Sequence, residues 1–320
     1  MDTPSPQQFA EVGAGNILKI PYRGFRGEFV RRWMALFGTT PVVCAILWRR
    51  IDPERSFKGQ SGKQTHQYVK PVHLLWALLL LKVYGTESVM RSMVGTKEQP
   101  VTEKSFRKWT VLFVRAISFL EPDVVSFRVF ALFCRISNHI TKIIWSNRFL
   151  NNIGNRTTVT VDGTDFNCEI RFNKRFYSHK FHSGGLRYEI GVCIRTGHVV
   201  WVHGPFRCGQ NDITISRQAV LLALNKGEKV EADLGYKGED IKINAPNEYG
   251  EKEVEAMKAR ARSRHETVNR RIRHFGILED RYRHKICDHS RYFRAATVIT
   301  QLNIETNAPL FRLTTKIVYE

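Results

Sequence analysis

One change of pattern, close to residue 155, constrains the fold of this 320-residue chain more than any other feature. Before it, apolar residues recur at the three- and four-residue spacing of helices. After it, β-branched residues and short apolar runs indicate strands. Residues typical of loops stand at the change itself, namely Asn151, Asn152, Gly154 and Asn155. We therefore expect a helical part followed by a part built on a sheet.

The second part predicts an order of strand, strand, strand, helix, strand and helix. The second and third strands form a hairpin, because only residues 195–197 join them. Three antiparallel strands followed by a parallel one are the order of an RNase H-like fold, although other mixed α/β folds share it. The segments are Thr157–Asp162, Leu186–Ile194, His198–His203, a helix Asp212–Leu224 capped by Asp212, Glu228–Asp233 and a basic helix Lys252–Phe275.

The fold class predicted from these elements is α/β, an RNase H-like mixed-sheet catalytic core with an all-α N-terminal region. Residues 1–25, rich in Pro, Gly, Ser and Gln, are predicted to be a flexible tail. Residues 26–150 form the helical region, either a helix-turn-helix or a purely packing domain, and residues 155–310 form the RNase H-like domain. Helices are expected at Val72–Tyr84, Thr102–Leu120 with Thr102 as N-cap, Phe127–Trp145 and Tyr292–Leu302.

The charge balance narrows the class of partner. Fifty Lys and Arg residues oppose thirty Asp and Glu, a formal net charge of +20. A chain this basic commonly binds a polyanion such as nucleic acid, although ribosome-associated and membrane-surface proteins are also basic. The longest apolar run, Leu74–Leu81, is too short to span a bilayer. The six cysteines form no CxxC pair or zinc-finger spacing, and we expect reduced, mostly buried thiols.

Two acids end strands that lie side by side in such a sheet. Asp162 ends the first strand and Asp233 ends the fourth. Carboxylates on rigid elements suit Mg²⁺ or Mn²⁺, and two such ions cleave phosphodiesters with a third acid. Glu266 is the candidate third ligand, since it is the only acid between Glu255 and Glu279.

Several segments together resemble the DDE transposases of the Harbinger and insertion-sequence-five superfamily, across about residues 157–305. They are VDGTDF, SHKF, GLRYEIGV, HVVWVHGPF, NDITISR, ADLGYKG and RHETVNRR–FGILEDRYRH. In that family the matching acids bind metal, which implies that Asp162, Asp233 and Glu266 are the catalytic and metal-binding residues. A bacterial signature around the glutamate is matched at Arg262 and Arg273 but has Ala259 in place of tyrosine.

The resemblance implies a metal-dependent endonuclease that hydrolyses DNA at transposon ends and transfers the strands. It implies two Mg²⁺ or Mn²⁺ ions, double-stranded DNA of transposon ends and target as partner, an accessory DNA-binding protein, homo-oligomers and a nuclear location without membrane association. One alternative is a domesticated DNA-binding protein without catalytic activity. Another is an RNase H-like nuclease acting on RNA or RNA–DNA hybrids.

Each acid also has a purely structural interpretation. Asp162 and Asp233 precede turns, and Glu266 can pair with Arg262 and Arg270 on its own helix. The apolar stripe of that helix lies roughly opposite Glu266, so the helix either breaks near residue 263 or packs by its flank. Asp212 either caps its helix or supports the site.

The basic helix carries seven cations between residues 256 and 273. Backbone phosphates of DNA are their natural partners. Lys174, Arg175, Lys180 and Arg187 extend this surface from the hairpin side, whereas Asp165 is expected to be structural and His179 and His182 to be loop residues. The seven predicted DNA-binding residues are Lys258, Arg260, Arg262, Arg264, Arg270, Arg271 and Arg273.

Overall fold

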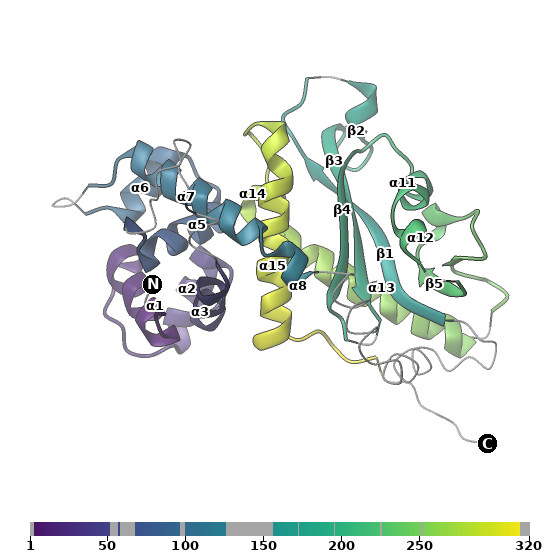
Figure 1. Ribbon diagram of the computed structural model, residues 1–320, viewed down its shortest axis with the longest axis horizontal. Helices are drawn as coiled ribbons and strands as arrows, with labels where there is room; N and C mark the ends of the chain where they lie inside the picture. Colours follow the sequence, from purple (N-terminus) through teal and green to yellow (C-terminus); the bar gives the residue numbers. More distant parts are fainter. Residues whose placement is uncertain are drawn as a thin grey trace, which may run out of the picture. The chain divides into compact units, whose positions relative to one another are not determined.

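The computed structural model describes residues 3–51, 57, 68–96, 100–125, 156–171, 173–194, 196–224, 226–250 and 252–313 (Figure 1). The predicted helix Phe127–Trp145 and the predicted break at 151–155 lie outside these residues. The chain divides into two compact units. Unit 1 comprises Met1–Val124 and Ile272–Ala308, and unit 2 comprises Val125–Arg271 and Pro309–Glu320. The C-terminal helix thus groups with the N-terminal helices, whereas the sequence pattern assigned it to the sheet domain.

Unit 2 is a mixed α/β structure, as predicted. Its long strands β1 (Arg156–Asn167), β3 (Ser183–Cys193) and β4 (Val199–Arg207) pair antiparallel in the order β4, β3, β1. Beyond β1 the sheet continues with two strands parallel to it, β5 (Glu228–Glu231) and β6 (Ile243–Asn244). The short strand β2 (Tyr177–Ser178) pairs with the start of β3. The predicted hairpin between the second and third strands and the predicted parallel strand are confirmed.

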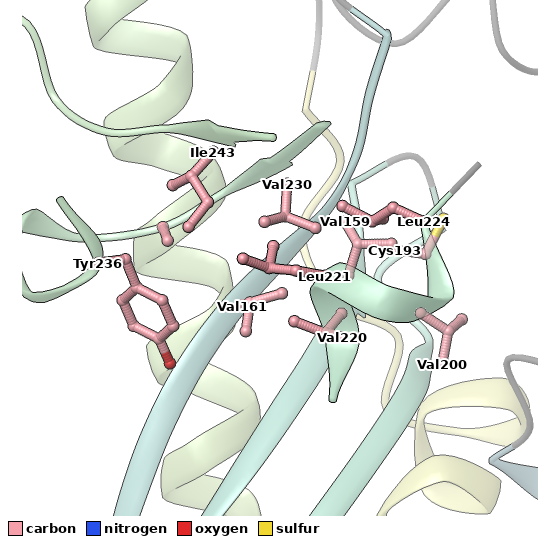
Figure 2. Close-up of a cluster of buried hydrophobic side chains, with 11 residues drawn as sticks. Val159, Val161, Cys193, Val200, Val220, Leu221, Leu224, Val230, Tyr236 and Ile243 are labelled. Carbon is pink, nitrogen blue, oxygen red and sulfur yellow. The ribbon is translucent and has the colours of Figure 1, made fainter. Parts of the chain in front are cut away.

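Helices cover both faces of this sheet (Figure 1). On one face α11 (Asp212–Gln218) and α12 (Val220–Ala223) pack over a core to which β1 contributes Val159 and Val161. Figure 2 shows these valines together with Leu221, and the ring of Tyr236 at the margin of the same cluster. The long helix α13 (Lys252–Arg273) covers the other face. Strand β1 contributes side chains to both of these faces, because successive residues of a strand point to opposite sides of the sheet.

The described part of unit 1 is built from helices. They are α1 (Pro6–Gly13), η1 (Ala14–Leu18), α2 (Gly27–Phe37), α3 (Pro41–Arg50), α5 (Pro71–Val83), α6 (Glu87–Val94), α7 (Glu103–Ser118), α8 (Glu121–Val124), α14 (Gly276–Glu279), η5 (Ile286–Asp288) and α15 (His289–Thr306). The predicted helices at 72–84, 102–120 and 292–302 are confirmed as α5, α7 and α15. Thr102 caps α7 as predicted, since its hydroxyl accepts from the Ser105 amide at 3.1 Å.

The predicted flexible tail is wrong for residues 6–18. Ser5 and Gln8 form a capping box with Pro6 at the first helical position, so residues that suggested disorder instead start α1. Phe9 is fully buried. A Cβ at Gly13 would lie only 2.3 Å from the Trp33 ring, and this close packing needs glycine.

No single helix among the described residues is long and apolar enough to cross a membrane. The bent pair α2 and α3 passes such a test only when its two members are taken together.

Candidate active site

Asp162 and Asp233 extend from two neighbouring parallel strands at the same level. The ladder between these strands ends where Thr160 of β1 pairs with Glu231 of β5. Asp162 lies two residues further within β1, and Asp233 lies two residues beyond the end of β5, at the start of the turn Leu234–Tyr236. Adjacent strands are about 4.8 Å apart. Asp162 is half-buried in β1, whereas Asp233 is exposed and its carboxylate accepts the Gly235 amide at 2.9 Å. The predicted strand end at Asp162 is wrong, because β1 stays paired with β3 through Asp162 to Asn167. Asp233 follows the end of β5, close to its predicted place. We call the region where the β1–β5 ladder ends, next to these two aspartates, the carboxylate edge.

The carboxylate of Asp212 joins this edge from the helical side. A Cβ at Gly163, next to Asp162, would lie 2.2 Å from Asp212 Oδ1. A Cβ at Gly235 would lie 3.5 Å from Asp212 Oδ2 and 3.1 Å from Asp233 Oδ1. Two glycines thus leave the space that Asp212 occupies, and its carboxylate approaches that of Asp233. Of the two roles considered for Asp212, this position favours support of the site.

The predicted N-cap role of Asp212 is wrong by one residue. Asn211 occupies the cap position and makes no side-chain cap hydrogen bond, while Asp212 is the first residue of α11. Its carboxylate instead pairs with the Arg187 guanidinium at 2.9 Å. The tertiary ion pair replaces the local cap, because Arg187 on β3 reaches the start of α11 and also donates to the Gln210 carbonyl at 2.9 Å.

Arg187 connects Asp212 to a second acid. Its guanidinium pairs with Asp165 at 2.6 Å, and Asp165 also accepts the Ser178 hydroxyl at 2.6 Å. Asp165 is therefore structural and directed to the hairpin, as predicted. Burial raises the pKa of Asp212, and Asp233 and Asp165 raise it further, while Arg187 opposes the shift. Burial therefore outweighs the ion pair with Arg187 at this carboxyl group.

Sequence reasoning missed Glu189, a buried acid on β3. It pairs in register with Gly163, its Oε2 accepts from Trp201 Nε1 at 2.9 Å, and its Oε1 accepts from the Ser216 hydroxyl. Burial raises the pKa of Glu189 despite these two hydrogen bonds, with Asp212 adding to the shift. An acid in the largely apolar strand run LRYEIGVCI was the signal that could have identified it as a buried, hydrogen-bonded residue.

Tyr236, three residues after Asp233, is the second residue that was missed. Its side chain is 1% exposed, and its ring belongs to the core of unit 2 (Figure 2). Burial raises the pKa of Tyr236 well above its usual range, and nearby carboxylates add to the shift. The phenol is therefore a neutral donor. The carboxylates that act on it are those of Asp212, Glu189, Asp162 and Asp233.

Asn269 on α13 is the third residue that was missed, and it contacts Asp162 directly. Its Nδ2 donates to Asp162 Oδ2 at 2.7 Å, while its buried Oδ1 has no hydrogen-bond partner. One turn earlier, His265 Nδ1 hydrogen-bonds the Thr160 hydroxyl at 2.8 Å. A polar residue within an apolar helix stripe, next to Val268, was the available signal.

Glu266 is exposed on α13, one turn before Asn269. The helix is unbroken through residue 263, so the predicted break is wrong and packing by the flank is what occurs. His265 and Asn269 join the buried face, which rotates it toward the Glu266 side. Even so, no three His, Cys, Asp or Glu side chains in the described part of the chain stand close enough to hold a metal ion.

The seven cations of α13 do not form one surface. Arg264 is 2% exposed and donates to the carbonyls of Ile194 and Cys193, the latter at 3.1 Å, so its predicted DNA contact is wrong. Arg262 pairs with the buried Glu231. Lys258 pairs with Glu255 at 2.7 Å. Arg262 and Arg264 are thus engaged by contacts with the sheet, and Lys258 by an ion pair within α13 itself. Arg260 and Arg270 are exposed, and Arg271 and Arg273 are half-buried.

The remaining predicted loop and thiol residues lie where the sequence indicated. His179 and His182 are exposed in the turn after β2. Cys44, Cys168, Cys193 and Cys208 are buried free thiols, and Cys287 is exposed. Cys134 lies outside the described residues.

Comparisons of this chain with known family models, with curated proteins and with solved structures give no match. The functional argument therefore depends on the geometry of the carboxylate edge and on the distribution of charge around it.

Proposed function

We propose that this protein is a metal-dependent DNA endonuclease of the DDE transposase type. One observation carries the proposal: Asp162 and Asp233 each lie two residues beyond the last pair, Thr160 and Glu231, of the parallel β1–β5 ladder. Rigid, adjacent carboxylates are what a phosphodiester-cleaving site needs. The high net positive charge of +20 is consistent with a nucleic acid substrate.

The sheet supports an RNase H-like assignment in this proposal. Three antiparallel strands lie beside two strands parallel to the first, in the order β4, β3, β1, β5, β6. Along the chain, helices α11 and α12 lie between β4 and β5, and α13 follows β6 and covers the opposite face of the sheet. We infer the fold from this topology, and the N-terminal unit is proposed as its all-α companion.

The donor set of the edge fits a hard divalent cation. Asp162 and Asp233 offer carboxylate oxygens, the ligand type that Mg²⁺ and Mn²⁺ prefer. The unpartnered Oδ1 of Asn269 lies on the side chain that holds Asp162. Burial raises the pKa of the nearby Asp212, and the charge of Asp233 adds to the shift. When bound, two such ions activate the attacking water or 3′-hydroxyl and stabilise the leaving oxygen.

Glu266 is proposed as the third acid. Residues three apart on a helix have Cβ atoms about 5–6 Å apart, so Glu266 is a near neighbour of Asn269, whose amide touches Asp162. We propose that a change of side-chain rotamer brings the Glu266 carboxylate toward Asp162 when metal binds. Its exposure leaves that rotation unhindered.

The partners follow from the same proposal. Double-stranded DNA of transposon ends and target is the substrate, an accessory DNA-binding protein and a homo-oligomer assist, and the nucleus is the site of action. Among the predicted DNA contacts of α13, Arg260 and Arg270 are the exposed cations that can reach phosphates.

The test is nicking and strand transfer on duplex DNA by the full chain with Mg²⁺ or Mn²⁺. Asp162→Asn, Asp233→Asn and Glu266→Gln keep side-chain size, and each is expected to lower the rate about 100-fold or more, because each removes several kcal/mol of transition-state stabilisation. Asp240→Asn, an exposed acid, is the matched control. Equal activity of all four variants would overturn the proposal. Faster cleavage of RNA–DNA hybrid than of duplex DNA would instead identify an RNase H-like nuclease.

A second function is favoured by one specific observation. Glu266 is exposed, and the described residues contain no group of three acids that could hold a metal as they stand. A domesticated protein that binds DNA without cutting it fits this arrangement. Tight DNA binding by the wild-type chain, with no cleavage under either metal or with nuclear extract added, is the result that identifies it.

A further inference from the structure

The segment between β1 and β3 carries a second basic surface. Residues 168–182 contain four Lys and Arg residues and a single acid, Glu169. The end of β4 adds another cation beside it. We call four of these exposed side chains the hairpin surface: Arg171, Lys174, Arg175 and Arg207.

Packing gathers these cations in one place. The turn η3 (Lys174–Phe176) rests against the turn that follows β4, where the Gly209 amide donates to the Arg175 carbonyl at 3.1 Å. A Cβ at Gly209 would lie 2.8 Å from that carbonyl oxygen, so the approach needs glycine. The Arg207 guanidinium lies 5.4 Å from the centre of the Phe176 ring. The surface is therefore held by backbone contacts and is not a chance meeting of mobile side chains.

Acids do not neutralise this surface. Within the described part of the chain, Arg171, Lys174, Arg175 and Arg207 make no ion pair, whereas Lys258 and Arg262 of α13 pair with acids. A row of exposed cations without acidic partners is the arrangement that attracts backbone phosphates. Acids thus pair with Lys258 and Arg262 of α13, whereas the four cations of the hairpin surface stay open to a ligand.

The segment that carries most of this surface, with η3 and β2, follows the end of β1 (Figure 1). From Asp162 to Asn167, the last residue of β1, the strand advances five residues, or about 17 Å at about 3.3 Å per residue. Base pairs rise about 3.4 Å each. A duplex cleaved at Asp162 and running along β1 therefore presents backbone phosphates to the hairpin on the order of five base pairs away.

We propose that the hairpin surface binds the phosphate backbone of duplex DNA about five base pairs to one side of the cleaved bond. It thereby sets the minimum length of duplex on that side. This inference deepens the proposed function by locating the substrate on the enzyme, but its binding component does not require cleavage.

The first experiment measures DNA affinity of the full chain by fluorescence anisotropy over a salt series. The double variant Lys174→Ala/Arg175→Ala is compared with Lys226→Ala/Lys252→Ala, which removes two exposed cations elsewhere in unit 2. The hairpin variant is expected to reduce the slope of log K against log salt by about two and to weaken binding on the order of tenfold. The control is expected to leave both unchanged.

The second experiment shortens the duplex on each side of the cleaved bond in turn. Wild-type cleavage is expected to fall when one side drops below about five base pairs, and the hairpin variant is expected to lose this length dependence.

Equal effects of the two double variants on the salt slope overturn the inference. Equal hairpin-dependent affinity for anionic vesicles or single-stranded RNA overturns the assignment of duplex DNA. If the wild-type chain never cleaves, the proposed endonuclease fails, yet the binding comparison still decides the role of the hairpin surface.

Discussion

Replacing Glu231 by glutamine is expected to remove a pH-dependent loss of stability from unit 2. Glu231 is fully buried on β5, where the Arg262 guanidinium donates to it. Burial raises the pKa of Glu231 from its usual 4.5 to about 7, although Lys258 and Arg262 oppose the shift. The nearby Glu255 raises the pKa further. The buried site thus favours the neutral acid over the carboxylate even with its partner present.

The sign follows from proton uptake. Between pH 4.5 and about 7 the folded chain holds a proton on Glu231 that the unfolded chain has released, so stability falls as pH rises through this window. At about 1.4 kcal/mol per pKa unit, the shift corresponds to about 2–3 kcal/mol lost between pH 5 and pH 8. Glu231→Gln cannot ionise and should lack this component.

The assay is urea unfolding at pH 5 and pH 8, read by hydrogen exchange in peptides from β1 and β5 so that only unit 2 is reported. Glu231→Gln should be more stable than wild type at pH 8 relative to pH 5 by that amount. Glu239→Gln, which removes an acid from the surface pair with Arg217, is the control and should retain the wild-type pH dependence. Parallel pH profiles for wild type and Glu231→Gln would refute the reasoning.

Three further predictions concern the carboxylate edge. Gly163→Ala places a Cβ 2.2 Å from Asp212 Oδ1 and should cost about 1–3 kcal/mol, seen as a lower melting temperature by circular dichroism; an unchanged melting temperature contradicts it. Asn269→Ala removes the donor to Asp162, and calorimetric titration with Mn²⁺ should show affinity about 10–100-fold weaker; equal affinity excludes a positioning role. Alkaline titration of Tyr236→Phe at 295 nm should coincide with wild type until the protein unfolds, because burial and the carboxylates keep Tyr236 protonated, and an earlier difference between the curves refutes this.

Local rules predicted the elements that depend on neighbouring residues. The apolar run of α5 and the Thr102 cap of α7 need no tertiary information, because a helix satisfies its hydrogen bonds within the segment. The end of the fourth strand before Asp233 was visible for a similar reason, since strand runs end at turn residues. The predicted strand end at Asp162 failed, because pairing with β3 carries β1 on to Asn167 and no local spacing records that partner.

The sequence pattern did not distinguish buried from exposed residues of the same chemical type. Arg264 and Arg260 look alike in a basic helix, yet one is buried against β-strand carbonyls and the other is exposed. The same limit explains Asp212, whose position suits a helix cap until Arg187 draws its carboxylate away. In each case the deciding partner is distant in sequence, so no local spacing records it.

The sequence by itself determined the class of the fold, the strand and helix order after residue 155, and the acid that follows the fourth strand, because these depend on periodicity and turn chemistry. Only the tertiary structure decided which polar side chains face one another. Asn269 meets Asp162, Glu189 lies opposite Gly163, and Arg264 turns inward. The reason is that burial and ion pairing are set by how a helix rotates on a sheet, and that rotation is the sum of contacts between segments far apart in the chain.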